Sequence, residues 1–255
     1  MVANTSSLNW FPYVKTKPQA CLRMFCFPYA GGGATLFRRW SEQLPATVEV
    51  LPVQLPGREN LVKEQAYTSL GQLVAALAPV IQPYCDKPFI FFGHSMGAFV
   101  CYELARYLQK EKLATPRHLF ISANRAPHLP NPWPLLYDLP EDRFRQELLR
   151  LGGTPQEVLE NEEVMAVVQP LLRADFTLCE TYQYVPGPPL TASISAFGGR
   201  GDKSVNAQEL NAWRAHTNGI FMCHMFAGNH FFLHAQEAAL LTVITQTLQW
   251  ILLQL

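Results

Sequence analysis

The sequence predicts an α/β fold in which a mostly parallel sheet carries helices on both faces. Three observations support this prediction. Short apolar runs alternate with helical patterns, one apolar run leads through a glycine-flanked serine into a helix, and one long stretch without strands interrupts the alternation. Buried parallel strands are continuously apolar, and helices connect them. A chain of 255 residues is long enough for one such domain with an insertion.

The apolar runs are the predicted strands. Each is short, rich in apolar or aromatic residues and followed by residues typical of turns, as expected for buried strands. They cover residues 22–27, 48–53, 89–92, 118–122, 193–197 and 221–226.

Apolar residues recur at helical spacing between these runs. We predict helices over residues 36–44, 69–81, 96–109, 207–216 and 231–253. Residues 240–255 are apolar, but threonine and glutamine residues interrupt them and the stretch is too short for a membrane anchor. Leu240, Ile244 and Leu248 share one helical face, so we expect this helix to pack on the sheet.

Residues 126–189 break the alternation and are called the insertion below. They begin with several prolines, continue with helical patterns over 141–151 and 162–179, and end on Pro186-Gly-Pro-Pro189. This segment is too long for a plain loop. It predicts a helical lid over an active site, and a packing subdomain without a gating role is the alternative.

Residues 93–97, Gly-His-Ser-Met-Gly, follow the apolar run 89–92 and precede a helical pattern. A G-x-S-x-G sequence between a strand and a helix indicates the nucleophile elbow of an α/β-hydrolase, with Ser95 at the apex of a tight turn. An incidental serine in a glycine-rich turn is the alternative. We therefore predict a single α/β-hydrolase domain over residues 1–255, with Ser95 as a nucleophile.

A serine nucleophile needs a histidine base and an acid that orients the histidine. In this fold the chain order is serine, acid, histidine. His230 lies in a loop just after the predicted strand 221–226 and is the preferred base, with His234 as its rival. Asp202 follows the strand 193–197 in a glycine-rich loop and is the preferred acid, with Asp175 as the fallback.

An oxyanion hole needs two backbone N–H groups. One comes from the residue after the nucleophile, which is Met96 here, and the other from a loop after an early strand. The glycine-rich segment 27–33 fits the second position. It lacks the lysine and the glycine spacing of phosphate-binding loops, so we discount a phosphate site there.

The bulk composition excludes several classes of function. Twenty basic and twenty acidic residues cancel, and no charged block indicates a nucleic acid or an anionic membrane as partner. The six cysteines show no metal-ligand spacing, which favours reduced thiols in the cytoplasm. Residues 1–18 lack the apolar region of a signal peptide.

Several motifs occur together in the order found in one family. They are Phe27-Pro-Tyr-Ala-Gly-Gly, Gln54-Leu-Pro-Gly-Arg-Glu59, Phe92-Gly-His-Ser-Met-Gly-Ala98, Leu172-Arg-Ala-Asp175 with Glu180-Thr-Tyr182, Phe197-Gly-Gly199 and Gly228-Asn-His-Phe-Phe-Leu233. From about residue 25 onward the chain resembles the type II (external) thioesterases of nonribosomal peptide and polyketide synthase pathways. One departure is Asn229, where the family more often has glycine.

The resemblance implies a catalytic triad of Ser95, Asp202 and His230, and it places the second oxyanion amide at Ala30. It also implies that residues 126–189 form the lid. The expected reaction is hydrolysis of acyl groups from the phosphopantetheine arm of acyl or peptidyl carrier proteins, which clears misprimed or stalled carriers. No metal and no cofactor are expected, and we expect a cytoplasmic monomer.

Three alternatives remain open at this point. A thioesterase specific for medium or long fatty acyl chains would need a deep apolar channel under the lid. A soluble esterase would act on free esters without a carrier partner. A non-catalytic α/β-hydrolase scaffold would only bind a partner, although all three triad positions are filled.

Overall fold

Six parallel strands form the centre of the molecule in the computed structural model, which describes residues 9–255. The strands are β1 (Leu22–Phe27), β2 (Val48–Pro52), β3 (Phe89–His94), β4 (His118–Ser122), β5 (Ser193–Gly199) and β6 (Phe221–Phe226). Their order in the sheet is β2-β1-β3-β4-β5-β6. The predicted α/β fold with a parallel sheet is confirmed, and β3 and β5 each extend two residues beyond their predicted ends.

The apolar character of the strands explains their central position. Phe25 of β1 lies in register with Leu51 of β2 and with Phe91 of β3, and all three side chains are buried. Strands covered on both faces need apolar residues at every position rather than at alternate ones. Because all six strands run parallel, their carboxyl ends meet at one edge of the sheet.

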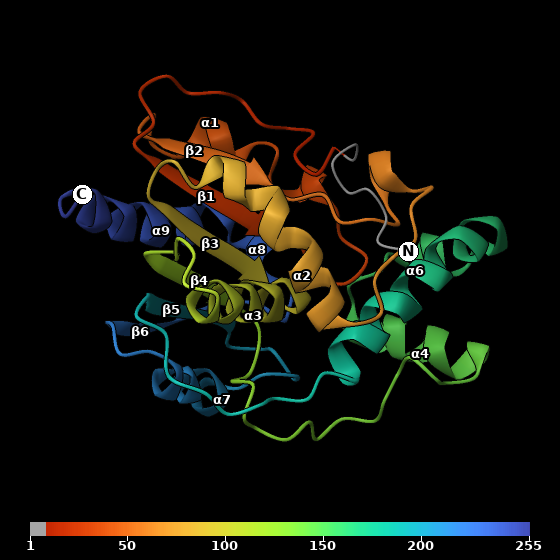
Figure 1. The fold of residues 1–255 in the computed structure, drawn as a ribbon. Helices are drawn as coiled ribbons and strands as arrows, with labels where there is room; N and C mark the ends of the chain where they lie inside the picture. Colours follow the sequence, from red (N-terminus) through yellow and green to blue (C-terminus); the bar gives the residue numbers. More distant parts are fainter. Residues whose placement is uncertain (1–8) are drawn as a thin grey trace.

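Helices cover both faces of the sheet (Figure 1). On one face, α2 (Leu70–Ile81), α3 (Met96–Lys110) and α7 (Ala207–Asn211) contribute to a large buried cluster. On the other face, α1 (Trp40–Gln43), α8 (Phe232–Ala235) and α9 (Glu237–Leu252) contribute to a second cluster. In α9 the buried residues include Leu240, Ile244 and Leu248, as predicted.

None of the helices described for residues 9–255 is long and apolar enough to cross a membrane.

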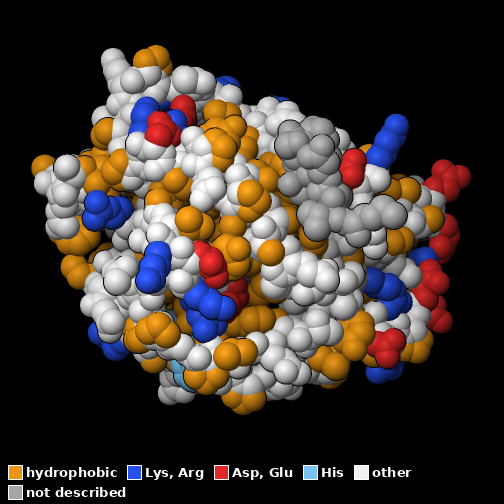
Figure 2. All heavy atoms as spheres, viewed as in Figure 1, with side chains coloured by type: hydrophobic (Ala, Val, Ile, Leu, Met, Phe, Trp, Pro, Cys, Tyr) orange, Lys and Arg blue, Asp and Glu red, His pale blue; other side chains and the backbone are white. Residues whose placement is uncertain are grey.

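The insertion lies between β4 and β5 and contains α4 (Glu141–Leu151), α5 (Gln156–Leu159) and α6 (Glu162–Glu180). These helices project to one side of the sheet (Figure 1). They have an apolar cluster of their own, which includes Phe144, Leu148 and Met165. Figure 2 shows acidic side chains along the outer edge of the insertion. Glu160 and Glu163 are among the exposed residues of this segment.

Three predicted helices differ from the structure. The helix expected over 36–44 is a 3₁₀ turn, Ala34–Phe37, followed by the short α1, which ends because Pro45 forces Leu44 into an extended conformation. The helix expected over 207–216 changes from α to 3₁₀ at Ala212. The helix expected over 231–253 is interrupted at Gln236, where hydrogen bonds from Trp40 and Gln43 to Glu237 fix a separate start for α9.

Candidate active site

Ser95 lies in the tight turn between β3 and α3. Its backbone has φ 52° and ψ −115°, a conformation that residues with a side chain rarely adopt. Two hydrogen bonds hold this turn: the N–H of Ser95 donates to the carbonyl of Ser122 at 2.8 Å, and Asn124 Nδ2 donates to the carbonyl of Ser95 at 2.8 Å. The strained turn presents the Ser95 hydroxyl at the carboxyl edge of the sheet.

Gly93 and Gly97 make this turn possible. A Cβ atom at Gly93 would collide with the backbone of Gly97 and Ala98, and one at Gly97 would collide with the carbonyl groups of Phe27 and Pro28. The first glycine lets α3 begin close to β3, and the second lets α3 approach the end of β1. Side chains are therefore excluded at both positions of the turn.

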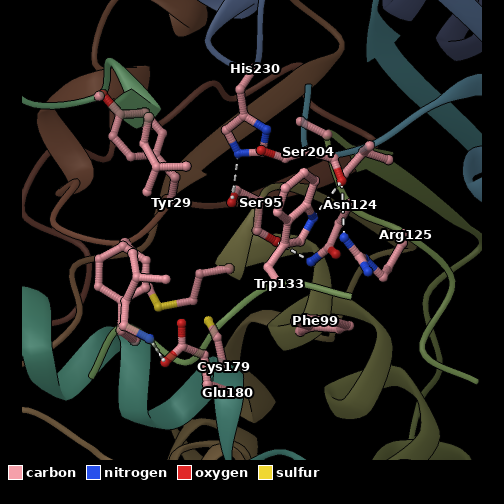
Figure 3. Close-up of a pocket in the computed structure, with 18 of the residues that line it drawn as sticks. Tyr29, Ser95, Phe99, Asn124, Arg125, Trp133, Cys179, Glu180, Ser204 and His230 are labelled. Atoms are coloured by element: carbon pink, nitrogen blue, oxygen red, sulfur yellow. Dashed lines mark hydrogen bonds between the residues drawn. The ribbon is translucent and has the colours of Figure 1, made fainter. Parts of the chain in front are cut away.

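Ser95, His230 and Asp202 form one hydrogen-bonded chain. Ser95 Oγ lies 3.0 Å from His230 Nε2, and His230 Nδ1 lies 2.8 Å from Asp202 Oδ2 (Figure 3 shows the first contact). The Asp202 side chain is fully buried, and its other oxygen, Oδ1, accepts hydrogen bonds from the N–H groups of Ser204 and Val205. The structure thus brings together the three residues that the sequence singled out.

The loop that carries His230 contains the departure from the family pattern. Gly228 has a φ of +112°, whereas Asn229 is not among the residues with positive φ. Glycine is therefore required at 228 but not at 229. Asn229 uses its side chain instead, because its Oδ1 accepts the N–H of Phe231 at 3.0 Å.

His94 supports the loop that carries His230 through a contact with its backbone. The His94 side chain is fully buried. Its Nε2 lies 3.0 Å from the backbone carbonyl of His230, and its Nδ1 lies 2.8 Å from Ser122 Oγ. Burial, together with the nearby His230, holds the pKa of His94 well below its ordinary value. His94 is therefore neutral at physiological pH.

The two rival residues have other partners. His234 Nε2 lies 3.1 Å from the hydroxyl of Tyr29. Asp175, on α6, forms a buried ion pair with Arg58 and accepts the N–H of Gly31 at 2.7 Å. Neither rival contacts Ser95 or the catalytic chain through these hydrogen bonds.

The predicted oxyanion residues lie beside Ser95. Met96 is the first residue of α3, and the first N–H groups of a helix have no partner within the helix. Ala30 belongs to the loop after β1, in a turn closed by a 2.9 Å hydrogen bond from the N–H of Gly32 to the carbonyl of Tyr29. Both residues line the cavity that contains Ser95 and His230.

This cavity has a volume of about 270 Å³ and extends from the catalytic chain into the insertion (Figure 3). Its wall is mostly apolar, with Phe99 from α3 and Leu148, Leu172 and Phe176 from the insertion. Trp133 and Arg125 also line it. The insertion therefore contributes much of the wall of the cavity that contains Ser95 and His230.

Glu180 also lines this cavity, and the sequence predicted no role for it. Its Oε2 accepts the N–H groups of Leu136 and Tyr137 at 2.8 and 2.9 Å. Burial raises the pKa of Glu180, and the two amides partly offset this effect. The carboxylate thereby ties the end of α6 to the start of the insertion.

Asn124 is the second residue that the sequence did not identify. It supports Ser95 from the end of β4, but its position alone carries no pattern that distinguishes it from other turn residues.

Among residues 9–255, no group of three or more His, Cys, Asp or Glu side chains has the arrangement of a metal site.

Comparison with known proteins identifies similar chains. The family model described as thioesterase domain matches residues 22–248. The chain is 44% identical over 249 residues to a protein of Brevibacillus parabrevis named linear gramicidin dehydrogenase LgrE, covering 96% of this chain and 95% of that protein.

Two solved structures share the fold. RedJ, a thioesterase from the prodiginine biosynthetic pathway in Streptomyces coelicolor, has a TM-score of 0.85 and 36% identity, covering 92% of this chain and 94% of that chain. YbtT, a type II thioesterase from the yersiniabactin NRPS/PKS biosynthetic pathway, has a TM-score of 0.81 and 32% identity, covering 91% of this chain and 94% of that chain.

Proposed function

Because this chain belongs to the thioesterase family, and within it to the type II thioesterases of nonribosomal peptide and polyketide pathways, we propose that it removes acyl groups from the phosphopantetheine arm of carrier proteins. The observation that carries the proposal is the hydrogen-bonded chain from Ser95 through His230 to Asp202 beside an apolar cavity. Acyl or peptidyl carrier protein domains are the partners that this reaction requires.

In the first step Ser95 attacks the thioester carbonyl. The bond from Ser95 Oγ to the carbonyl carbon forms while His230 Nε2 accepts the hydroxyl proton. Asp202 accepts the hydrogen bond from His230 Nδ1–H and stabilises the resulting imidazolium. The carbon–sulfur bond then breaks, the phosphopantetheine sulfur takes the proton from His230, and the acyl group stays on Ser95.

In the second step water releases the acyl group. His230 Nε2 accepts a proton from the attacking water, and the new tetrahedral intermediate collapses with Ser95 as the leaving group. Ser95 regains its proton from His230, and a free carboxylic acid departs. The two steps need neither a metal ion nor a redox cofactor.

The N–H groups of Met96 and Ala30 stabilise the oxyanion of both tetrahedral intermediates in this proposal. The start of α3 adds a favourable field, since a helix N-terminus carries partial positive charge. A loss of one such donor typically costs about 10²–10³ in kcat. The insertion acts as a lid, because it encloses the acyl cavity and excludes water during acyl transfer.

Hydrolysis of acetyl-loaded carrier protein tests the proposal, with the wild type beside Ser95→Ala. We expect release by the wild type and near-total loss in the variant. Strong preference for medium or long acyl chains over acetyl would favour the fatty acyl carrier thioesterase instead. Equal turnover of free small esters would favour a soluble esterase, and failure of a fluorophosphonate to label folded protein would favour the scaffold.

The name of the Brevibacillus relative suggests a second candidate, a dehydrogenase. Hydride transfer would consume a reduced nicotinamide and release an aldehyde from the thioester, whereas hydrolysis releases an acid. Following nicotinamide absorbance and product identity in the same reaction separates the two. We expect acid release without nicotinamide oxidation, because the Ser95–His230 contact suits acyl transfer.

A further inference from the structure

The proposed oxyanion amide belongs to a four-residue turn, Tyr29 to Gly32. The N–H of Gly32 donates to the carbonyl of Tyr29 at 2.9 Å, and Gly31 has a φ of +78°, which together define a type II turn. A trans peptide unit points its C=O and N–H in opposite directions. Since the carbonyl of Tyr29 faces into the turn, the N–H of Ala30 faces outward, on a residue that lines the cavity beside Ser95.

The central peptide of this turn is held by a side chain from another part of the chain. Type I and type II turns differ by a flip of the central peptide, whose N–H here belongs to Gly31. That N–H donates to Asp175 Oδ2 at 2.7 Å. A hydrogen bond to a carboxylate is stronger than one to a neutral acceptor. Asp175 therefore favours the type II form of the turn over its flipped alternative.

Arg58, from the loop after β2, holds Asp175 in place. Its Nη1 and Nη2 donate to the two carboxylate oxygens of Asp175 at 2.7 and 2.8 Å. Nη1 also lies 3.1 Å from the carbonyl of Gly32. Arg58 is 5% exposed and Asp175 is 1% exposed, so the pair is shielded from water and its geometry is fixed by both partners.

Asp175 and its neighbour on α6 both touch the turn. Leu172 lies one helical turn before Asp175, and a Cβ atom at Gly31 would come within 2.6 Å of Leu172 Cδ2. The insertion helix thus packs directly on the oxyanion turn through an apolar contact and a charged hydrogen bond. Any displacement of α6 removes both contacts from the turn.

We propose that Asp175, supported by Arg58, is a positioning residue that makes the oxyanion turn depend on the seating of α6. With α6 on the core, Asp175 and Leu172 hold the turn in the position that presents the Ala30 N–H to the transition state. Without these contacts the central peptide is free to flip and the whole turn, including the Ala30 N–H, is free to shift. This inference rests on the proposed function, which assigns the oxyanion role to Ala30. It assigns the insertion a part in the chemical step in addition to its part in enclosing the acyl group.

Asp175→Asn tests this proposal, because it keeps the size of the side chain and removes its charge. Glu49→Gln is the matched control. Glu49 is also buried, at 4% exposure, and pairs with Arg23 at 2.7 Å near the amino ends of β1 and β2, the opposite edge of the sheet. For each protein we would measure kcat and KM on an acyl carrier protein and on a free small thioester. We would also measure thermal unfolding and the affinity for a trifluoromethyl ketone, which forms a tetrahedral adduct with serine.

We expect Asp175→Asn to lower kcat by about ten- to a hundredfold on both substrates, since a misplaced oxyanion donor acts on the transition state. Affinity for the ketone should fall by a similar factor, while KM changes by less than about twofold. The Glu49→Gln control should lose thermal stability without losing kcat. Folded Asp175→Asn with the kcat and ketone affinity of the wild type would overturn the proposal.

If Asp175→Asn does not fold, Arg58→Lys decides the question. Lysine keeps the charge but lacks the two-pronged geometry of the guanidinium, so we expect a smaller loss of kcat in the same direction. Wild-type kcat in that variant would overturn the proposal. Failure of the proposed function gives a different result: the wild type would cleave the free thioester but not the carrier-bound one, and the variants could still be compared on the free substrate.

Discussion

His94 Nε2 lies 3.0 Å from the backbone carbonyl oxygen of His230, so the residue just before the proposed nucleophile supports the loop that carries the proposed base. A carbonyl only accepts hydrogen bonds, so His94 Nε2 carries the proton and donates. His94 Nδ1 then accepts from the hydroxyl of Ser122. The contact links the serine turn and the histidine loop independently of the catalytic hydrogen bond between them.

Replacing His94 should therefore reduce the rate without removing any catalytic group. We expect His94→Ala to lower kcat by about ten- to a hundredfold, because small displacements of a catalytic group have effects of that size. His94→Gln, which keeps a donor, should lose less. Steady-state kinetics with thermal unfolding as a check on folding would measure this. Wild-type kcat in folded His94→Ala would show that the loop holds its position without His94.

Asp202→Asn tests the assignment of the acid. An asparagine in this position favours the wrong tautomer of His230, so we expect kcat to fall by about 10⁴. Ser95→Ala combined with Asp202→Asn should be no slower than Ser95→Ala alone, because the three groups act as one unit. Single-turnover release from an acyl carrier protein would measure both. A loss of less than about tenfold in Asp202→Asn would contradict the assignment.

Gly97→Ala should disrupt the site through the backbone. The added methyl group would collide with the carbonyl groups of Phe27 and Pro28, so α3 would have to move away from the end of β1. We expect loss of activity together with a fall in the melting temperature. Gly71→Ala, near the start of α2, is the control, because its Cβ would have no neighbour closer than 4.0 Å. That substitution should be neutral or stabilise the protein by up to about 1 kcal/mol.

The free energy of unfolding should decrease as the pH falls below about 6.5. Burial lowers the pKa of His118 to about 3, and burial with the neighbouring His128 lowers that of His216 to about 4, both from an ordinary value of 6.5. For each histidine, at a pH between its lowered pKa and the ordinary value of 6.5, the unfolded chain binds a proton that the folded chain does not. Acid therefore favours unfolding, and stability returns as the pH rises. Each histidine contributes up to about 1.4 kcal/mol per pH unit.

Urea unfolding at about pH 7.5 and about pH 5 would measure this effect, since most carboxylates stay ionised over that range. His118→Gln is the informative variant, because it removes one titrating group and should reduce the pH dependence by about one proton. Equal unfolding free energies of the wild type at both pH values would contradict the prediction.

The strands, the fold class and the family were predictable because they depend on local patterns. Continuous apolar runs such as residues 89–92 need no knowledge of their neighbours to be recognised as buried strands. The proposed catalytic residues could also be predicted, because their order in the chain and their positions after strand ends constrain the choice. The separate start of α9 could not be predicted, because contacts of Trp40 and Gln43 with Glu237, far apart in the sequence, set it.

The partner of Asp175 was not predictable in the same way. Asp175 was the fallback acid, and it meets Arg58, which lies 117 positions earlier in the chain. No local spacing indicates such a pair, and only the packing of α6 on the loop after β2 brings it together. The role of Asn124 could not be predicted either, because it depends on a contact with the turn that follows the neighbouring strand, β3.

The contact between Ser95 and His230 joins residues 135 positions apart. Contacts of such long range form late in folding, since much chain entropy is lost before they are made. His230 also precedes α9, whose residues Leu240 and Ile244 complete the core beneath the sheet. During refolding, hydrolytic activity should therefore return no earlier than the docking of the C-terminal helix. A chain that has not yet finished folding leaves carrier-bound intermediates intact.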